Sequence, residues 1–142
     1  MKKSGIVMDS NVLVAGLLSR NGASYRLLQL MGKRKFELHL SIPLLLEYED
    51  AAKRLVSKTD LTQKDIDDIL DYLCLIGKKW EIHYLWRPFL KDPNDDMVLE
   101  LAVTARCEWI VTFNTRDFAG IEQFGIRVLT PRDFLKITGE IP

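Results

Sequence analysis

The chain has 142 residues, and its 20 Lys and Arg residues are balanced by 20 Asp and Glu residues, so the formal net charge is zero. This balance excludes a simple polybasic binder of nucleic acid or membranes, although a local basic patch stays possible. A hydrophobic content of 47% and a charged content of 28% exclude a disordered chain and favour one globular domain over residues 1–142.

In the first half of the chain, short apolar runs alternate with longer helical patterns. Gly5 to Met8 is an apolar run typical of a buried strand. Residues 19–22 carry a turn signal, and Pro43 fits the first turn of a helix. We expect strands at 5–8 and 36–41, and helices at 11–18, 23–32 and 43 to about 57.

In the second half, Thr62 with Asp65 three residues later resembles a capping box, and apolar residues recur behind it at helical spacing. Pro88 and Pro93 make residues 86–94 irregular. We expect helices from 63 to about 77, at 95–106 and from 131, and strands at 80–84, 108–112 and 126–129.

Short strands that alternate with longer helices predict a parallel sheet covered on both faces. We therefore expect an α/β fold, a three-layer α/β/α sandwich with a central, mostly parallel sheet. In such sheets ligands bind outside the carboxyl ends of the strands. This rule directs attention to Asp9 and to residues 112–117.

Several classes of protein are excluded by simple features. No apolar run could span a bilayer, so we expect no membrane association through a helix. The first apolar stretch stops at Asp9, too early for a secretory leader. Cys74 and Cys107 give no disulfide framework, and neither His39 nor His83 has a partner at zinc-ligand spacing. We expect a cytoplasmic protein with reduced thiols and no zinc site.

Asp9 and Glu47 each allow two interpretations. Asp9 lies between apolar runs, where it can cap the helix that follows, bind a metal ion, or do both. Glu47 lies at the border of an apolar helical face, where periodicity favours a solvated side chain paired with Arg54 over one that faces a cleft.

A denser acidic signal lies at Asp92, Asp95 and Asp96, at the start of a predicted helix. The helix dipole favours acids there, but one acid is enough for a cap. Spacing places Asp95 above the apolar face, with Asp96 close behind.

The strand that ends at Thr112 brings Asn114 and Asp117 to the carboxyl edge of the sheet, with a turn rich in turn-forming residues as the alternative interpretation. Carboxylates gathered in one cleft raise one another's pKa, and a hard divalent cation such as Mg²⁺ or Mn²⁺ removes that penalty. Such ions activate water and neutralise a phosphodiester, and no His, Cys or Ser nucleophile pattern accompanies these acids.

The motifs at residues 7–13, 42–47, 92–96 and 111–118 together resemble a PIN-domain ribonuclease, of the VapC-like group of toxins from toxin–antitoxin pairs. The resemblance covers nearly the whole chain. It implies Mg²⁺- or Mn²⁺-dependent hydrolysis of RNA, a small antitoxin protein as partner, and a homodimer.

The resemblance also implies roles for individual residues. Asp9 and Glu47 would bind metal, which for Glu47 overrides the solvated interpretation. Counting back from Ala102 favours Asp95 as the third acid, whereas counting back from Thr112 favours Asp96, and both stay open.

Where the family often has a fourth acid, this chain has Asn114, so either Asp117 replaces that acid or a second metal is weakly held. Asn11 and Thr112 match the supporting polar residues of the family. The cations nearest in sequence to the acidic motifs are candidate contacts to RNA phosphates: Arg20, Lys91 and Arg116.

Two alternatives to an active PIN ribonuclease remain. The segment from Asp9 to Val12, with Thr112, resembles the nucleophile loop of haloacid-dehalogenase-like phosphatases, although the second Asp of that loop is Asn11 here. The other alternative is a degenerate PIN-like domain that binds RNA or a protein without cutting, and it is motivated by Asn114.

Overall fold

A computed structural model describes residues 4–33, 35–82 and 89–142. Five strands form one sheet in the order β3-β2-β1-β4-β5, and every neighbouring pair is parallel. The strands are β1 (Gly5–Met8), β2 (Glu37–Ser41), β3 (Lys78–Trp80), β4 (Trp109–Val111) and β5 (Arg127–Leu129). The predicted α/β fold with a parallel sheet is confirmed.

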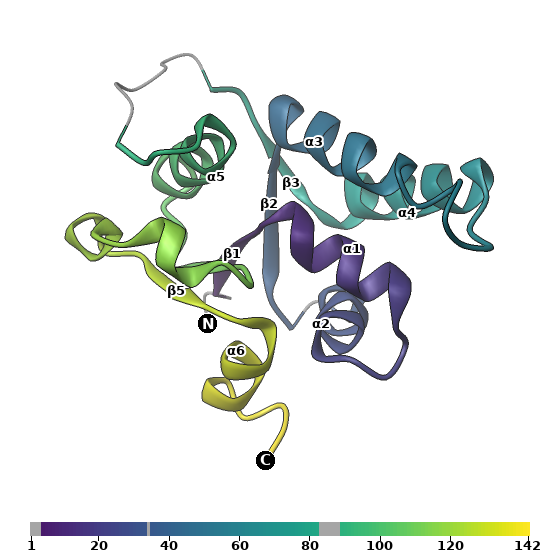
Figure 1. Ribbon diagram of the computed structural model, residues 1–142. Helices are drawn as coiled ribbons and strands as arrows, with labels where there is room; N and C mark the ends of the chain where they lie inside the picture. The colour runs from purple at the N-terminus through teal and green to yellow at the C-terminus, as the bar shows by residue number, and fades with distance from the viewer. Residues whose placement is uncertain (1–3, 34, 83–88) are drawn as a thin grey trace.

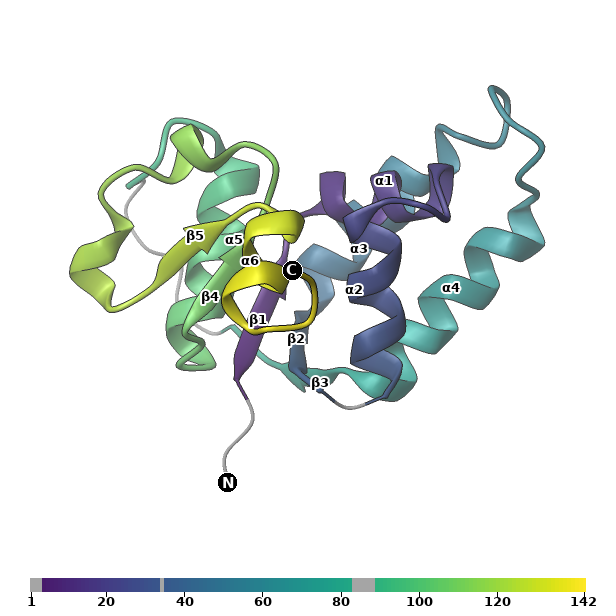
Figure 2. The same cartoon turned by 90° about the horizontal axis from the view of Figure 1, so that it is seen from below.

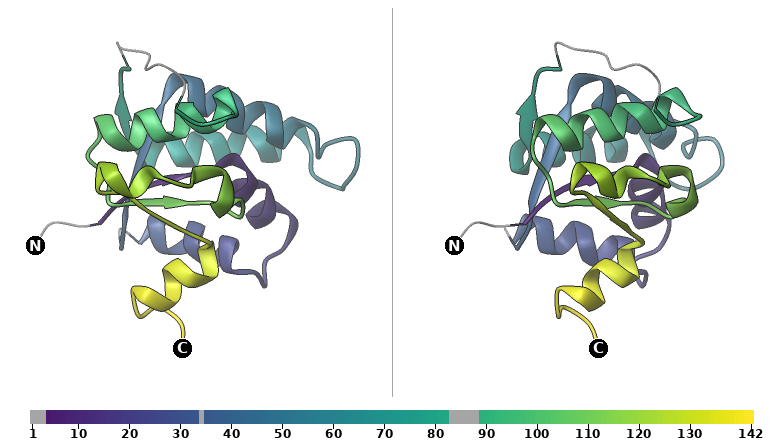
Figure 3. Two further views of the ribbon diagram at one scale, coloured as in Figure 1. Left: turned by 60° about the vertical axis from the view of Figure 1, so that its left-hand side comes forward. Right: turned by 90° about the vertical axis from the view of Figure 1, so that its left-hand side faces the viewer.

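Helices cover both faces of this sheet (Figure 1). They are α1 (Ser10–Leu18), α2 (Ala23–Gly32), α3 (Ile42–Lys53), α4 (Gln63–Ile76), α5 (Pro93–Thr104) and α6 (Pro131–Ile137), with short 3₁₀ helices η1 (Thr115–Phe118) and η2 (Ile121–Phe124). In Figure 3, α5 lies on one side of the sheet and α2 and α6 lie on the other. Figure 2 shows α1 to α4 grouped together.

Local sequence signals explain where most helices begin. The Ser41 side chain accepts a hydrogen bond from the backbone N–H of Leu44 and caps α3. Thr62 and Asp65 form the predicted capping box of α4. Thr130 caps α6 by accepting from the backbone N–H of Asp133. None of the helices in the described ranges has the length and apolar character needed to cross a membrane.

Three predicted boundaries are wrong. Helix α3 ends at Lys53 rather than near residue 57, because the chain turns after it, and the Thr59 hydroxyl donates to the carbonyl of Leu55 within that turn. The strand expected at 80–84 is β3 at Lys78–Trp80, and residues 83 and 84 lie outside the described residues, as do residues 86–88 of the stretch expected to be irregular. Helix α5 starts at Pro93, two residues early.

Strand β1 is the central strand and leads directly to the polar residues of interest. Its last three residues, Ile6, Val7 and Met8, are completely buried. The backbone N–H of the next residue, Asp9, still donates to the carbonyl of Val111 on β4 at 2.9 Å. The ends of β1 and β4 therefore lie side by side, as the sequence predicts.

Candidate functional site

Asp9 is held at the carboxyl end of β1 by three hydrogen bonds, the longest of them from the Asn11 side-chain amide to Oδ2 at 3.5 Å. Its Oδ1 accepts from the backbone N–H of Ser10 at 2.8 Å, which makes Asp9 the N-cap of α1. Its Oδ2 accepts from the hydroxyl of Thr112 at 2.8 Å. The capping interpretation is thus confirmed, and the side chain, only 9% exposed, is fixed in place. Burial raises the pKa of Asp9, and the charges of Asp117 and Asp92 raise it further.

Thr112 and Asn11 join the ends of β1 and β4 through their side chains. Thr112 is completely buried. Its hydroxyl oxygen accepts from the Asn11 side-chain amide at 3.3 Å and from the backbone N–H of Asn114 at 3.1 Å. The Asn11 side-chain oxygen accepts from the backbone N–H of Phe113 at 3.3 Å. Both side chains also donate to Asp9 Oδ2, so these contacts orient the Asp9 carboxylate.

Glu47 lies on α3, which is anchored close to the same strand end. The hydroxyl of Tyr48, a fully buried residue, donates to the carbonyl of Met8. The Ser10 hydroxyl donates to Glu47 Oε1 at 3.5 Å. Arg54 bonds Asp50 instead of Glu47, at 2.5 Å. The prediction of a solvated ion pair between Glu47 and Arg54 is therefore wrong. Glu47 is half-buried, and its carboxylate contacts Ser10 at the start of α1.

Asp95 lies among other acids. Burial is the largest cause that raises its pKa, to about 6, and the charges of Asp9, Asp92, Asp117 and Asp96 act in the same direction. Asp95 lines a pocket of about 420 Å³. We call it the acidic pocket, and its lining includes Asp92, Asp95 and Asp117 together with Phe89, Lys91 and Arg116.

Asp96 makes different contacts from Asp95. Its Oδ1 accepts from the backbone N–H groups of Phe89 and Leu90, at 3.2 and 2.9 Å. Both of these residues line the acidic pocket. Asp96 therefore fixes one wall of the pocket, whereas the Asp95 carboxylate lies in its lining.

The three candidate RNA contacts do not lie together. Lys91 and Arg116 line the acidic pocket, as their position in the sequence suggests. Arg20 lines a separate pocket that also includes residues of α2 and α6. Nearness in sequence to Asp9 was a poor guide for Arg20, because α1 lies between the two residues.

Asp92 is a pocket residue that sequence reasoning did not select. Its side chain caps α5 by accepting from the backbone N–H of Asn94 at 2.9 Å. Its charge also raises the pKa of both Asp9 and Asp95. The sequence does show Asp92 as the first acid of residues 92–96. Because a helix cap explains an acid at that position, the sequence gives no separate sign that Asp92 also acts on Asp9 and Asp95.

The donor chemistry of these residues fits a hard divalent cation. Asp9, Asp95 and Asp117 supply only oxygen ligands, which Mg²⁺ and Mn²⁺ prefer. Burial is the largest cause of the raised pKa of Asp95, and a cation would relieve the repulsion from neighbouring acids that adds to it. Within the ranges that the structure describes, no three His, Cys, Asp or Glu side chains are gathered tightly enough to hold a metal ion.

Comparisons with known proteins agree with the fold and the motifs. A family model described as a PIN domain matches residues 5–116. The chain is also similar to a solved structure of VapBC2 from Rickettsia felis bound to a DNA fragment from their promoter, with a TM-score of 0.60. Identity is 14%, and the likeness covers 87% of this chain and 98% of that chain. A search of curated proteins finds no match.

Proposed function

Because this chain belongs to the PIN-domain family, we propose that it is a nuclease that hydrolyses RNA with the help of Mg²⁺ or Mn²⁺. The observation that carries the proposal is that acids from separate segments act on one another: the charge of Asp117, on η1, raises the pKa of Asp9, and the charges of Asp9 and Asp117 raise the pKa of Asp95, on α5. Packing of the core does not require acids at this edge of the sheet. Like charges placed close together disfavour the ionised form of a carboxyl group.

In the proposed site, Asp9, Glu47 and Asp95 would hold the metal, with Asp117 as the replacement for the acid missing at Asn114. A divalent ion bound there supplies activation of water and neutralisation of the phosphodiester charge. Asp95, whose pKa is raised to about 6, would bind the ion as the ionised carboxylate.

The surrounding residues position the acids and the substrate. Thr112 and Asn11 keep the Asp9 carboxylate in one orientation through the hydrogen bonds described above. Lys91 and Arg116 line the same pocket and are placed to contact phosphate oxygens of the substrate. Asp96 holds the backbone of the pocket wall.

The same proposal includes a role as the toxin of a toxin–antitoxin pair, with a small antitoxin as partner. Its support is the likeness to a VapBC complex and an apolar pocket of about 300 Å³ between α1, α2 and α4. Leu17, Leu28 and Ile69 line this pocket, which suits an apolar partner segment.

A homodimer and a cytoplasmic location complete the proposal. Ile42 and Leu46, one turn apart on α3, are 62% and 60% exposed, which suits an apolar interface. The free thiols of Cys74 and Cys107 suit a reducing compartment. Light scattering of the purified protein tests the dimer, and a monomer at all concentrations would remove that part.

The test is cleavage of a panel of RNAs by purified protein with Mn²⁺, with Mg²⁺ and with EDTA. We expect cleavage with either ion and none in EDTA. A mock preparation of the Asp9→Asn variant controls for contaminating nucleases. Binding of RNA without cleavage under any condition would instead establish the degenerate, non-enzymatic domain, for which Asn114 is the motivating residue.

A further inference from the structure

The second charged pocket of the molecule lies between α2 and α6 and has a volume of about 520 Å³. Four cationic side chains line it, Arg20, Arg26, Arg132 and Lys136, and we call it the basic pocket. Of the described residues in its lining, none is Asp or Glu. In a chain with equal numbers of acids and bases, this is a marked local separation of charge.

The four cations are available to a ligand. All are exposed. The ion pairs found within the described ranges join other cations, such as Lys53 and Lys64, and none joins these four. The acids nearest in sequence, Asp133 and Glu140, do not line the pocket. The N-terminus of α2 also faces the pocket at Gly22 and lacks a side-chain cap, which adds to the positive field.

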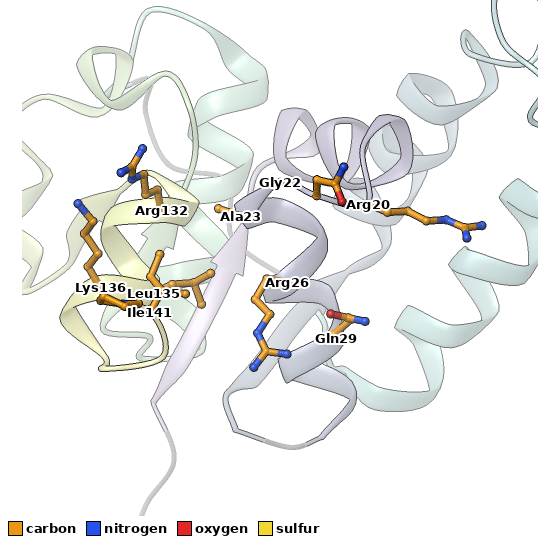
Figure 4. Close-up of a pocket in the computed structure, with 11 residues that line it drawn as sticks. Arg20, Gly22, Ala23, Arg26, Gln29, Arg132, Leu135, Lys136 and Ile141 are labelled. Carbon is orange, nitrogen blue, oxygen red and sulfur yellow. The ribbon is translucent and has the colours of Figure 1, made fainter.

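The arrangement of the charges suits an extended anion. Figure 4 shows Arg132 and Lys136 extending from the α6 side, Arg26 from α2, and Arg20 pointing away from α6. The charged ends are spread around the rim and do not converge on one point, as a site for a single phosphate would require. Successive phosphates of a nucleic-acid strand match such a spread set of cations.

The basic pocket is also connected to the acidic site. The carbonyl of Leu129, at the end of β5, accepts from the backbone N–H of Thr112 at 3.0 Å, and Thr112 in turn bonds Asp9. Arg132 follows Leu129 by three residues, so their Cα atoms lie at most about 11 Å apart. The segment that carries Arg132 therefore begins close to the residues that hold Asp9.

We infer that the basic pocket is a second RNA-binding site, which holds the sugar–phosphate backbone of the strand that is cut at the acidic site. This inference rests on the proposed nuclease function and adds a binding surface outside the acidic pocket. The contacts there are to phosphates, so the site contributes affinity and position without reading the base sequence.

The test measures binding of a labelled single-stranded RNA to the Asp9→Asn variant, with and without Arg132→Ala and Lys136→Ala. Affinity is measured between about 50 and about 200 mM salt. Loss of two phosphate contacts is expected to weaken binding and to reduce the slope of log K against log salt by about 1.4. The matched control, Lys58→Ala with Lys79→Ala, removes the same charge from exposed positions outside the pocket and should leave the slope unchanged.

Two outcomes of the RNA titration would overturn the inference: an unchanged salt slope in the Arg132→Ala, Lys136→Ala variant, or an equal change of slope in the control. Binding of polyglutamate, an acidic polypeptide, is measured in the same way. If the double substitution abolishes polyglutamate binding and leaves RNA binding intact, the pocket is assigned to an acidic protein. Circular dichroism confirms that each variant is folded. Cleavage by the unmutated protein with Mn²⁺ is measured in parallel. Failure of that cleavage contradicts the proposed function, whereas the salt slope tests only the basic pocket.

Discussion

In the acidic site, Asp9 is 9% exposed and Thr112 is fully buried, whereas all four cations of the basic pocket are exposed. Each of these two buried side chains has hydrogen-bond partners on other segments of the chain, and the cations have no ion pairs among the described residues. Metal ligands must be held in one geometry, which requires such support. A polyanion needs only charge at suitable spacing, which exposed cations provide without being fixed in one geometry.

The difference predicts that single substitutions in the acidic site have large effects and that those in the basic pocket have graded effects. Asp9→Asn is expected to give the largest change, at least about a 100-fold loss of RNA cleavage, because losses of supporting residues alone reach that size. Asn also caps helices well, so the fold should be retained. Cleavage rates and circular dichroism check this, with Asp71→Asn on the exposed side of α4 as control. A variant that cuts at the wild-type rate would remove Asp9 from the site.

Asp95→Asn and Asp96→Asn should differ although the residues are adjacent. Asp95→Asn removes a carboxylate from the pocket lining and should match Asp9→Asn in its effect. Asn at position 96 keeps an oxygen that can accept from the N–H groups of Phe89 and Leu90, so the loss should be much smaller. Asp96→Ala removes that acceptor and should cost more than Asp96→Asn. Equal losses in the two Asn variants would contradict this division of roles.

Thr112→Val tests the support of Asp9. The valine fills the same buried space but lacks the hydroxyl that donates to Asp9 Oδ2. We expect Mn²⁺ affinity to fall by about 10- to 100-fold, as for other residues that orient metal ligands. Thr112→Ser keeps the hydroxyl and serves as the control. Equal affinity in the Val and Ser variants, measured by calorimetry, would show that this hydrogen bond has no role in binding the metal.

The pKa of Asp95 predicts how stability of the metal-free protein depends on pH. The pKa is about 6 in the folded protein, above the ordinary value of 3.8, so the folded state binds this proton more tightly. The stability that this provides is complete below about pH 3.8 and is lost as the pH rises through about 6. In EDTA, Asp95→Asn should therefore raise the melting temperature at about pH 7.5 and change it little at about pH 4. The reverse order in a thermal melt would contradict the assignment.

The smallest effect is expected when residues of the basic pocket are substituted and Mn²⁺ affinity of the acidic site is measured. Arg132→Ala with Lys136→Ala should leave Mn²⁺ affinity of the acidic site within about twofold, because both cations are exposed to solvent and salt, which screen their charge, and neither lines the acidic pocket. Calorimetric titration with Mn²⁺ measures this. A tenfold change would mean that the two pockets act as one site.

Most of the fold could be predicted because its signals are local. The apolar run from Gly5 to Met8 gave β1, and Thr62 with Asp65 gave the start of α4. Strand β3 was misplaced because Lys78 and Lys79 are exposed at the edge of the sheet and have no apolar pattern. Only pairing with β2 makes them a strand.

The site was predictable in part for the same reason. Asp9 and Thr112 follow apolar strands, and parallel strands bring such residues to one edge. The choice between Asp95 and Asp96 could not be made from spacing, because it depends on which of them meets the backbone of Phe89, a contact across a loop. The basic pocket was not predictable, since α2 and α6 are far apart in the sequence.

The central claim is that acids from the end of β1, from α3, from α5 and from η1 share one divalent cation. The most direct test is a crystal structure with Mn²⁺, located by its anomalous scattering. The account predicts a peak bound by Asp9 and Asp95, with Glu47 or Asp117 as a further ligand. A peak elsewhere, or no peak at Mn²⁺ concentrations that support cleavage, would contradict it.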